Sequence, residues 1–287
     1  MFTAFGPHAF EGRVFVARPD GSDVTTVLSP QSLLGYEGAF GNSLKMFILV
    51  AATQSTGGNN SVTNIVQYFP STGRSLPLQQ QLPAGGEGNG IPSPDNSKLV
   101  AEVAPPGGPR TNLWISDFQT KQFHQLTQGT AQDFNPVWSP DGQRIAFIRL
   151  TPPTPPISLQ LMTVSSQGGE AIVLLGASEH VGQAAYSPDG KKLAFDSING
   201  LETMDLTTMQ RMVILTKNQL HGNPLQRITE GYGMSWAKTQ DKIVLILLDL
   251  GTNRDQLWTV SSDGSNLQKI YTADIGVRIF SITFISN

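Results

Sequence analysis

The chain has 287 residues, a formal net charge of −3 and only 14% charged residues, against roughly a quarter in ordinary soluble domains. This balance gives no electrostatic reason to expect nucleic acid or an anionic membrane surface as a partner. There is no cysteine, which excludes disulfides, thiol nucleophiles and cysteine-ligated metals, and no stretch approaches the roughly 20 apolar residues of a membrane-spanning helix.

Strands separated by short turns are predicted from the start of the chain. Residues 13–22 read as a strand followed by Pro-Asp-Gly-Ser, and residues 45–50 and 65–69 read as two further strands, with Phe40 before them. The 29 glycines and 19 prolines supply the turns that many short strands require. No segment of useful length repeats apolar residues at helical spacing, so we expect an all-β fold.

A strand–turn–strand unit recurs in the middle of the chain. Its copies lie at 89–100, 135–148 and 183–195, and each turn begins with Ser-Pro-Asp. Proline sets φ for the first central position of such a turn, and Asp and Gly suit the positions after it. The three turn prolines stand 46 and 48 residues apart, close to the roughly 40–50-residue period of four-stranded propeller blades.

A second predicted hairpin follows each unit. It reads most clearly at 113–127, 159–175 and 256–271, and a weaker opening unit lies at 233–246. Within the unit that begins near residue 182, segments 212–216 and 225–229 compete for the outermost strand. We favour the first, because residues 201–216 then match 113–127 with a single insertion.

The two ends of the chain match complementary parts of one unit. Residues 13–22 match only its second half and residues 281–284 only its innermost strand, so we expect the terminal strands to pair, leaving no free sheet edge. The sequence therefore predicts a six-bladed β-propeller of four-stranded antiparallel blades, as a single domain over 1–287. The blades are 277–287 with 1–29, then 37–80, 88–128, 134–176, 182–217 and 232–273.

The segment Trp138–Gly142, the Leu/Ile-Ala-Phe strand after it and an aromatic strand ending in Asp-Gly-Ser together resemble the TolB-like (WD-like) β-propeller repeat. The resemblance covers nearly the whole chain. It implies a bacterial protein of the periplasm or the exterior, since the repeat occurs in the translocation protein TolB, which binds a peptidoglycan-associated lipoprotein. It also occurs as the gating propeller of prolyl-oligopeptidase-type peptidases. Met1–Gly6 lacks the features of a secretory signal, so the sequence leaves the compartment open.

No catalytic residue is carried over from the family, because this sequence has neither the N-terminal α/β domain of TolB nor a hydrolase domain. A Gly-x-Ser-x-Gly nucleophile elbow does not occur. The four histidines form no helix-borne zinc motif: His8, His124, His180 and His221. Solvated loop histidines are the simpler interpretation, and a metal held at the channel mouth by ligands from several blades is the alternative. We expect no catalytic residue, metal ligand or cofactor.

Two repeated columns are expected to be structural. The turn aspartates Asp95, Asp141 and Asp189 should bind backbone amides within their own turns. One aromatic position of the innermost strands should pack between blades. Its members are Phe40, Trp138, Tyr186, Trp236 and Phe284.

Polar residues three positions before those aromatics should line the mouth of the propeller channel. Such convergent polar groups either hydrate a channel or recognise a ligand. With residues of the neighbouring inter-blade loops, the predicted ligand-binding set is Glu37, Asn89, Asn135, Gln183, Ser281, Asp133, His180 and Tyr232.

Together these observations predict a monomeric, non-catalytic propeller that binds a protein, peptide or glycan ligand at its channel-mouth face, without nucleic acid and without membrane insertion. The alternative is a metal-dependent lyase or lactone hydrolase with its site at the same mouth. A further possibility is that the chain is the sensor part of a longer receptor or kinase.

Overall fold

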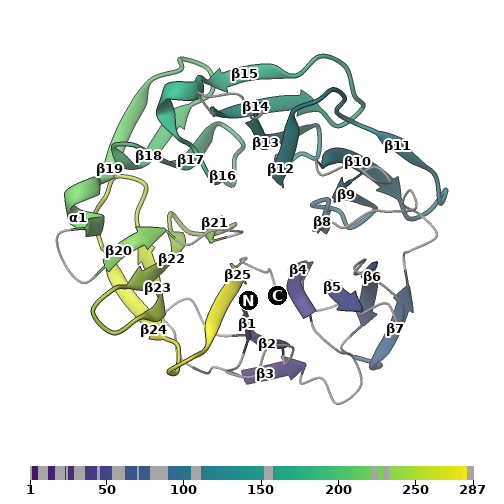
Figure 1. The fold of residues 1–287 in the computed structure, drawn as a ribbon, viewed down its shortest axis with the longest axis horizontal. Helices are drawn as coiled ribbons and strands as arrows, with labels where there is room; N and C mark the ends of the chain where they lie inside the picture. Colours follow the sequence, from purple (N-terminus) through teal and green to yellow (C-terminus); the bar gives the residue numbers. More distant parts are fainter. Residues whose placement is uncertain are drawn as a thin grey trace. The chain divides into compact units, whose positions relative to one another are not determined.

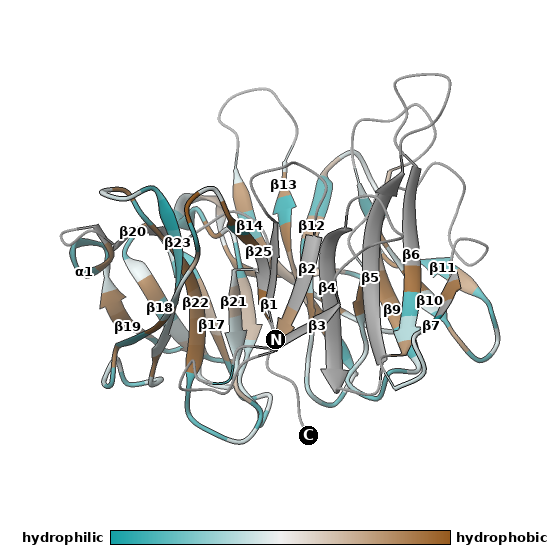
Figure 2. Ribbon diagram, turned by 90° about the horizontal axis from the view of Figure 1, so that it is seen from below, coloured by the Kyte–Doolittle hydropathy of each residue, from teal (hydrophilic) through white to brown (hydrophobic). Residues whose placement is uncertain are grey.

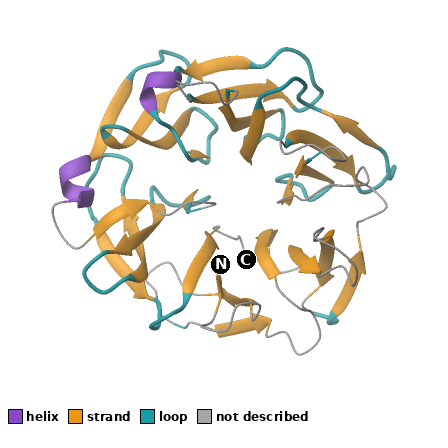
Figure 3. Ribbon diagram, viewed as in Figure 1, coloured by secondary structure: helices purple, strands orange, loops and turns teal. Residues whose placement is uncertain are grey.

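The computed structural model describes residues 2–5, 12–16, 23, 25–28, 36–43, 46–53, 62–69, 71–77, 90–104, 111–151, 158–221, 225–228 and 233–282. Antiparallel strands dominate these residues (Figure 3). The helical segments among them are the single-turn α1 (Lys217–His221) and the 3-10 turn η2 (Ala177–Glu179). The all-β prediction is confirmed. None of the described helices is long and apolar enough to cross a membrane.

The chain divides into two compact units, one of residues 1–32 with 182–286 and the other of residues 33–181 with residue 287. The described residues of the second unit form three four-stranded sheets (Figure 1). Their strands are β4 (Tyr36–Ser43), β5 (Met46–Thr53), β6 (Val62–Phe69) and β7 (Arg74–Pro77); β8 (Gly90–Pro92), β9 (Lys98–Val103), β10 (Asn112–Asp117) and β11 (Phe123–Gln125); and β12 (Gln132–Trp138), β13 (Arg144–Leu150), β14 (Leu159–Ser165) and β15 (Ile172–Leu175).

In the first unit, too, the part that the structure describes forms three sheets. One joins the ends of the chain: β25 (Arg278–Ile282), yellow in Figure 1, pairs with β1 (Phe2–Phe5), purple, and β2 (Gly12–Val16) and β3 (Thr25–Leu28) follow. The other two consist of β16 (Ala184–Tyr186), β17 (Lys192–Ser197), β18 (Gly200–Asp205) and β19 (Arg211–Thr216), and of β20 (Leu225–Ile228), β21 (Met234–Trp236), β22 (Ile243–Asp249), β23 (Arg254–Val260) and β24 (Gln268–Thr272).

The pairing of the two chain ends sets Phe2 opposite Ile282. A buried carboxylate fixes β25 in place: Asp255 accepts hydrogen bonds from the backbone N–H of Ile279 at 2.7 Å and from Nη1 of Arg278 at 2.9 Å. The predicted contact between the first and last strands is therefore present.

The Ser-Pro-Asp turns have the structure that their chemistry predicts. In the turn after β12, the hydroxyl of Ser139 donates to Asp141 Oδ1, which also accepts the N–H of Gln143 at 2.9 Å. The same hydroxyl oxygen accepts the N–H of Arg144 at 2.9 Å, where β13 begins. Asp95 and Asp189 repeat this arrangement in their own turns, so the three aspartates are structural, as expected.

The aromatic column is buried where it is described. Trp138, Tyr186 and Trp236 are each at most 9% exposed, and the indole Nε1 of Trp138 donates to the carbonyl of Ile91 at 3.0 Å. Hydrophobic residues concentrate along strands such as β17 and β22 (Figure 2). The core is formed largely by the apolar strands that flank each turn. Phe40 and Phe284 have side chains outside the described residues.

The prediction of six uniform four-stranded blades is corrected. Four blades are established by both strand pairing and described side-chain packing, and they begin at β8, β12, β16 and β21. The two remaining sheets, β4–β7 and β1–β3 with β25, are defined by backbone pairing, while most of their side chains lie outside the described residues. In these two sheets the described packing is limited to a few side chains, such as Phe15 and Ile279, so the number of established blades is four. The assignment of 1–287 to a single domain stays a prediction.

The sheet around β22 also departs from the four-stranded pattern, because it has five strands. The short β21 pairs with β22 only from Ile243 to Leu245, and β20 pairs further along the same strand, with Leu225 opposite Asp249. Segment 225–228 thus supplies hydrogen bonds to the part of β22 that β21 does not reach. The outer strand of the preceding sheet is β19, as favoured from the sequence.

Candidate functional site

The described part of the predicted mouth centres on the start of β12. Asp133 and Asn135 both lie on this strand, whose pairing with β13 shifts register between Phe134 and Val137. Asn135 has φ of 50°, a left-handed conformation that most residues avoid and that asparagine tolerates better than others. Pro136, which follows it, has no N–H to give to the ladder. The bulge therefore forms at the one point of β12 where the ladder is already interrupted.

A buried carboxylate from the neighbouring sheet holds this bulge. Glu102, at 8% exposure, comes from β9 and accepts the backbone N–H of Asn135 through Oε1 at 2.9 Å. This charge-assisted bond satisfies the donor that the register shift would otherwise remove from the ladder. The half-buried Asn135 is thereby fixed in its left-handed conformation at the bulge in β12.

Asp133 has a different role from the one predicted. It is fully buried, and both of its carboxylate oxygens accept hydrogen bonds from Arg149, from Nε at 2.7 Å and from Nη2 at 2.8 Å. The bond to Asp133 is the main cause that raises the pKa of Arg149, and the guanidinium carbon also lies 5.4 Å from the ring centroid of Phe147. Asp133 is thus an anchor within the sheet rather than a group available to a ligand.

Thr111, which directly precedes β10 of the preceding blade, binds the backbone of Asp133. Its hydroxyl donates to the carbonyl of Asp133 at 2.9 Å, and its carbonyl accepts the N–H of Asp133 at 2.9 Å. The next residue, Asn112, is 8% exposed, and its Oδ1 is a buried acceptor without a hydrogen-bond partner in the described part of the chain. Sequence reasoning missed Thr111, Asn112 and Glu102, because their strand positions are not polar in every copy of the repeat.

The remaining predicted residues are distributed over both units. His180 follows η2, is exposed, and has Nδ1 3.1 Å from the carbonyl of Ser178. Gln183 is buried in the other unit, where Ser281 lies in β25. Glu37 lies in β4, but its side chain and that of Ser281 are outside the described residues, as are Asn89 and Tyr232 altogether. Among the described residues of the set, the structure brings Asp133 and Asn135 together on β12, and the set as a whole stays a prediction.

The buried carboxyl of Asp196 organises the start of β16. Its Oδ1 accepts the backbone N–H groups of Gly182 at 2.8 Å and Gln183 at 2.7 Å. Burial raises the pKa of Asp196, and the two N–H groups oppose that shift. Within the described residues no group of three or more histidine, aspartate or glutamate side chains is placed to hold a metal ion.

Asp196→Asn is expected to stabilise the protein at neutral pH and to change little in acid. A carboxyl whose pKa is raised by folding contributes stability that is fully present below its unfolded pKa and lost as pH rises through the folded one. Asparagine keeps an Oδ1 acceptor for both amides and carries no charge. Thermal unfolding of both proteins from acidic to neutral pH measures this.

Asp189→Asn is the control for that prediction, since the Ser187 hydroxyl lowers the pKa of Asp189. The stability that Asp189 contributes is present above its unfolded pKa and lost as pH falls through its folded pKa. Asp189→Asn should therefore be less stable than the wild-type protein at neutral pH. A wild-type unfolding temperature above that of Asp196→Asn at neutral pH would contradict the assignment.

Residues 85–281 match the family model described as TolB beta propeller domain. The chain belongs to this family. Among solved structures, this TolB-family chain is similar to TolB from Acinetobacter baumannii, with a TM-score of 0.65 and 18% identity over 98% of this chain and 66% of that one. It is also similar to a putative TolB from Agrobacterium tumefaciens, with a TM-score of 0.67 and 14% identity over 96% of this chain and 100% of that one.

A curated relative gives a more local match. The uncharacterized peptidase YuxL of Bacillus subtilis (strain 168) is 34% identical over 83 residues, which are 29% of this chain and 12% of that protein. The TolB-family chain thus spans a small part of YuxL and just under two thirds of the Acinetobacter TolB.

Proposed function

We propose that this TolB-family propeller is a non-catalytic module that binds a peptide segment of a protein partner at the start of β12. The observation that carries the proposal is the left-handed Asn135 in a register shift, held by the buried Glu102. Conformations of this kind cost free energy and persist where the surroundings impose them, and they concentrate at binding and catalytic sites. Bulges likewise concentrate beside such sites, where they aim a side chain.

The chemistry of the site supports a peptide over other ligands. An asparagine amide is uncharged and contains both an acceptor and donors, the kinds of group that pair with the carbonyl and N–H groups of an extended backbone. The charged groups around it, Asp133 and Glu102, already bind within the protein, so the ligand would meet amide groups rather than free charge. The peptidase name of YuxL is in line with peptide recognition.

Asn135→Gly tests this proposal. Glycine adopts positive φ without strain, so the substitution removes the amide and leaves the bulge. Peptides selected on the wild-type protein from a phage-displayed library of random linear peptides should bind the variant about tenfold more weakly, the loss of one good hydrogen bond. Affinity is measured by fluorescence anisotropy with the selected peptides.

Asn266→Gly is the matched control. Asn266 also has a left-handed φ, 55°, and is exposed in the turn before β24. Peptide affinity should not change in this variant, and thermal unfolding should show that both variants remain folded. Selected peptides that bind Asn135→Gly as tightly as wild type would reject the start of β12 as the binding site.

A further inference from the structure

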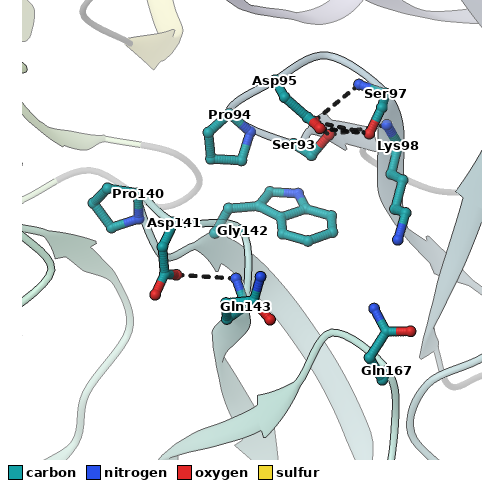
Figure 4. A pocket seen from close by; sticks show the side chains of 11 residues that line it. Ser93, Pro94, Asp95, Ser97, Lys98, Pro140, Asp141, Gly142, Gln143 and Gln167 are labelled. Atoms are coloured by element: carbon teal, nitrogen blue, oxygen red, sulfur yellow. Dashed lines mark hydrogen bonds between the residues drawn. The ribbon is translucent and has the colours of Figure 1, made fainter.

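A small polar pocket lies between two of the repeated turns, away from the start of β12. Figure 4 shows it between the turn that joins β8 to β9 and the turn that joins β12 to β13. Its volume is about 190 Å³, and Trp138 and Gln167 also line it. This is well below the roughly 300–1,000 Å³ of pockets for drug-sized ligands, so it would hold a ligand of about one ring.

Hydrogen bonds within the protein hold the two turns that form the pocket. The carboxylate of Asp95 accepts the hydroxyl of Ser93 at 2.6 Å and the N–H of Ser97 at 3.0 Å, and Asp141 accepts the N–H of Gln143 at 2.9 Å. These bonds fix both turns in the protein itself. A ligand would therefore meet a preformed wall and would not have to order a loop.

Side-chain amides face this pocket with unused hydrogen-bonding capacity. Gln143 and Gln167 are exposed, and their side chains make no hydrogen bond to the described part of the protein. Lys98 also lines the pocket, and its side chain points toward Gln167 (Figure 4). Each amide supplies an acceptor and two donors. Trp138 uses its Nε1 on Ile91, which leaves only carbon atoms of the indole to contact a ligand.

The charges on the walls argue against an ionic ligand. Asp95 and Asp141 carry negative charge and Lys98 positive charge, so an anion would meet two carboxylates and a cation would meet the ammonium group. Amides and fixed carboxylates together with aromatic carbon suit adjacent hydroxyl groups on a carbon ring. We propose that this pocket binds a small neutral polyhydroxylated ligand, a single hexose unit, either free or at the end of a glycan.

Methyl α-glucoside and the disaccharide cellobiose are the probes, added separately to the full chain. Saturation-transfer NMR should detect binding of at least one of them, with a dissociation constant of about 1 mM for so small a ligand. Gln143→Ala with Gln167→Ala should weaken binding at least tenfold. Gln119→Ala, an exposed glutamine in the turn between β10 and β11, should leave it unchanged.

Two results would overturn the proposal: no saturation transfer to either sugar well above that concentration, or transfer that the double variant does not reduce. Equal or tighter binding of glucuronate or glucosamine would also overturn it, since both carry a charge. The outcome does not depend on the peptide site, because Asn135 does not line this pocket.

Discussion

Asp133→Ala is expected to lower the free energy of unfolding by about 3 kcal/mol, the lower end of the cost of breaking a buried ion pair. The carboxylate is fully buried and receives two hydrogen bonds from Arg149, whose side chain is only 20% exposed. The substitution leaves a largely buried guanidinium without its partner. Urea denaturation followed by circular dichroism measures the loss.

The double variant Asp133→Ala with Arg149→Met is the control. It removes both charges, and methionine fills the space over Phe147, so much of the lost stability should return. This distinguishes an anchoring role from a ligand contact. A stable Asp133→Ala protein that no longer binds the selected peptides would show that Asp133 contacts the ligand.

Gly200→Ala is expected to destabilise the protein by about 3 kcal/mol or more, from left-handed strain together with overpacking. Gly200 has φ of 127° where β18 begins, and a Cβ there would lie 2.1 Å from the carbonyl oxygen of Leu215 and 2.7 Å from the backbone nitrogen of Lys217. Both atoms belong to the backbone, so relief requires β18 and β19 to separate. The unfolding temperature should fall steeply.

Gly129→Ala separates the two causes. Gly129 has a comparable φ of 115°, but no atom lies within 4 Å of the Cβ position. The Gly129→Ala variant should lose about 1 kcal/mol of unfolding free energy, from backbone strain alone. Equal losses for the two variants would show that the contact with Leu215 is unimportant.

Local chemistry explains what could be predicted of the fold. Ser-Pro-Asp turns between apolar strands were correctly located because their hydrogen bonds connect residues at most five apart, such as Ser139 and Arg144. The buried aromatic column was predictable for a related reason, since Trp138 and Tyr186 occupy the same place before the same turn. The number of blades was not predicted correctly, because sequence repeats indicate strands and do not show how each sheet packs.

The candidate site was predicted less well. Asn135 stays a predicted site residue: polar residues recur at its position, but its left-handed conformation depends on Glu102, 33 residues earlier in the chain. Asp133 was taken for a ligand contact because sequence cannot show that Arg149 covers it. The pocket at Gln143 and Gln167 was not predicted, because those glutamines come from different hairpins.

The sequence by itself determined that the chain is a series of paired strands with fixed turns, since these depend on contacts between near neighbours. Only the tertiary structure decided which polar residues are anchors and which face a pocket. The physical reason is that burial and ion pairing depend on side chains brought together from separate strands. The sequence alone does not show whether an aspartate is buried against an arginine or is accessible to a ligand.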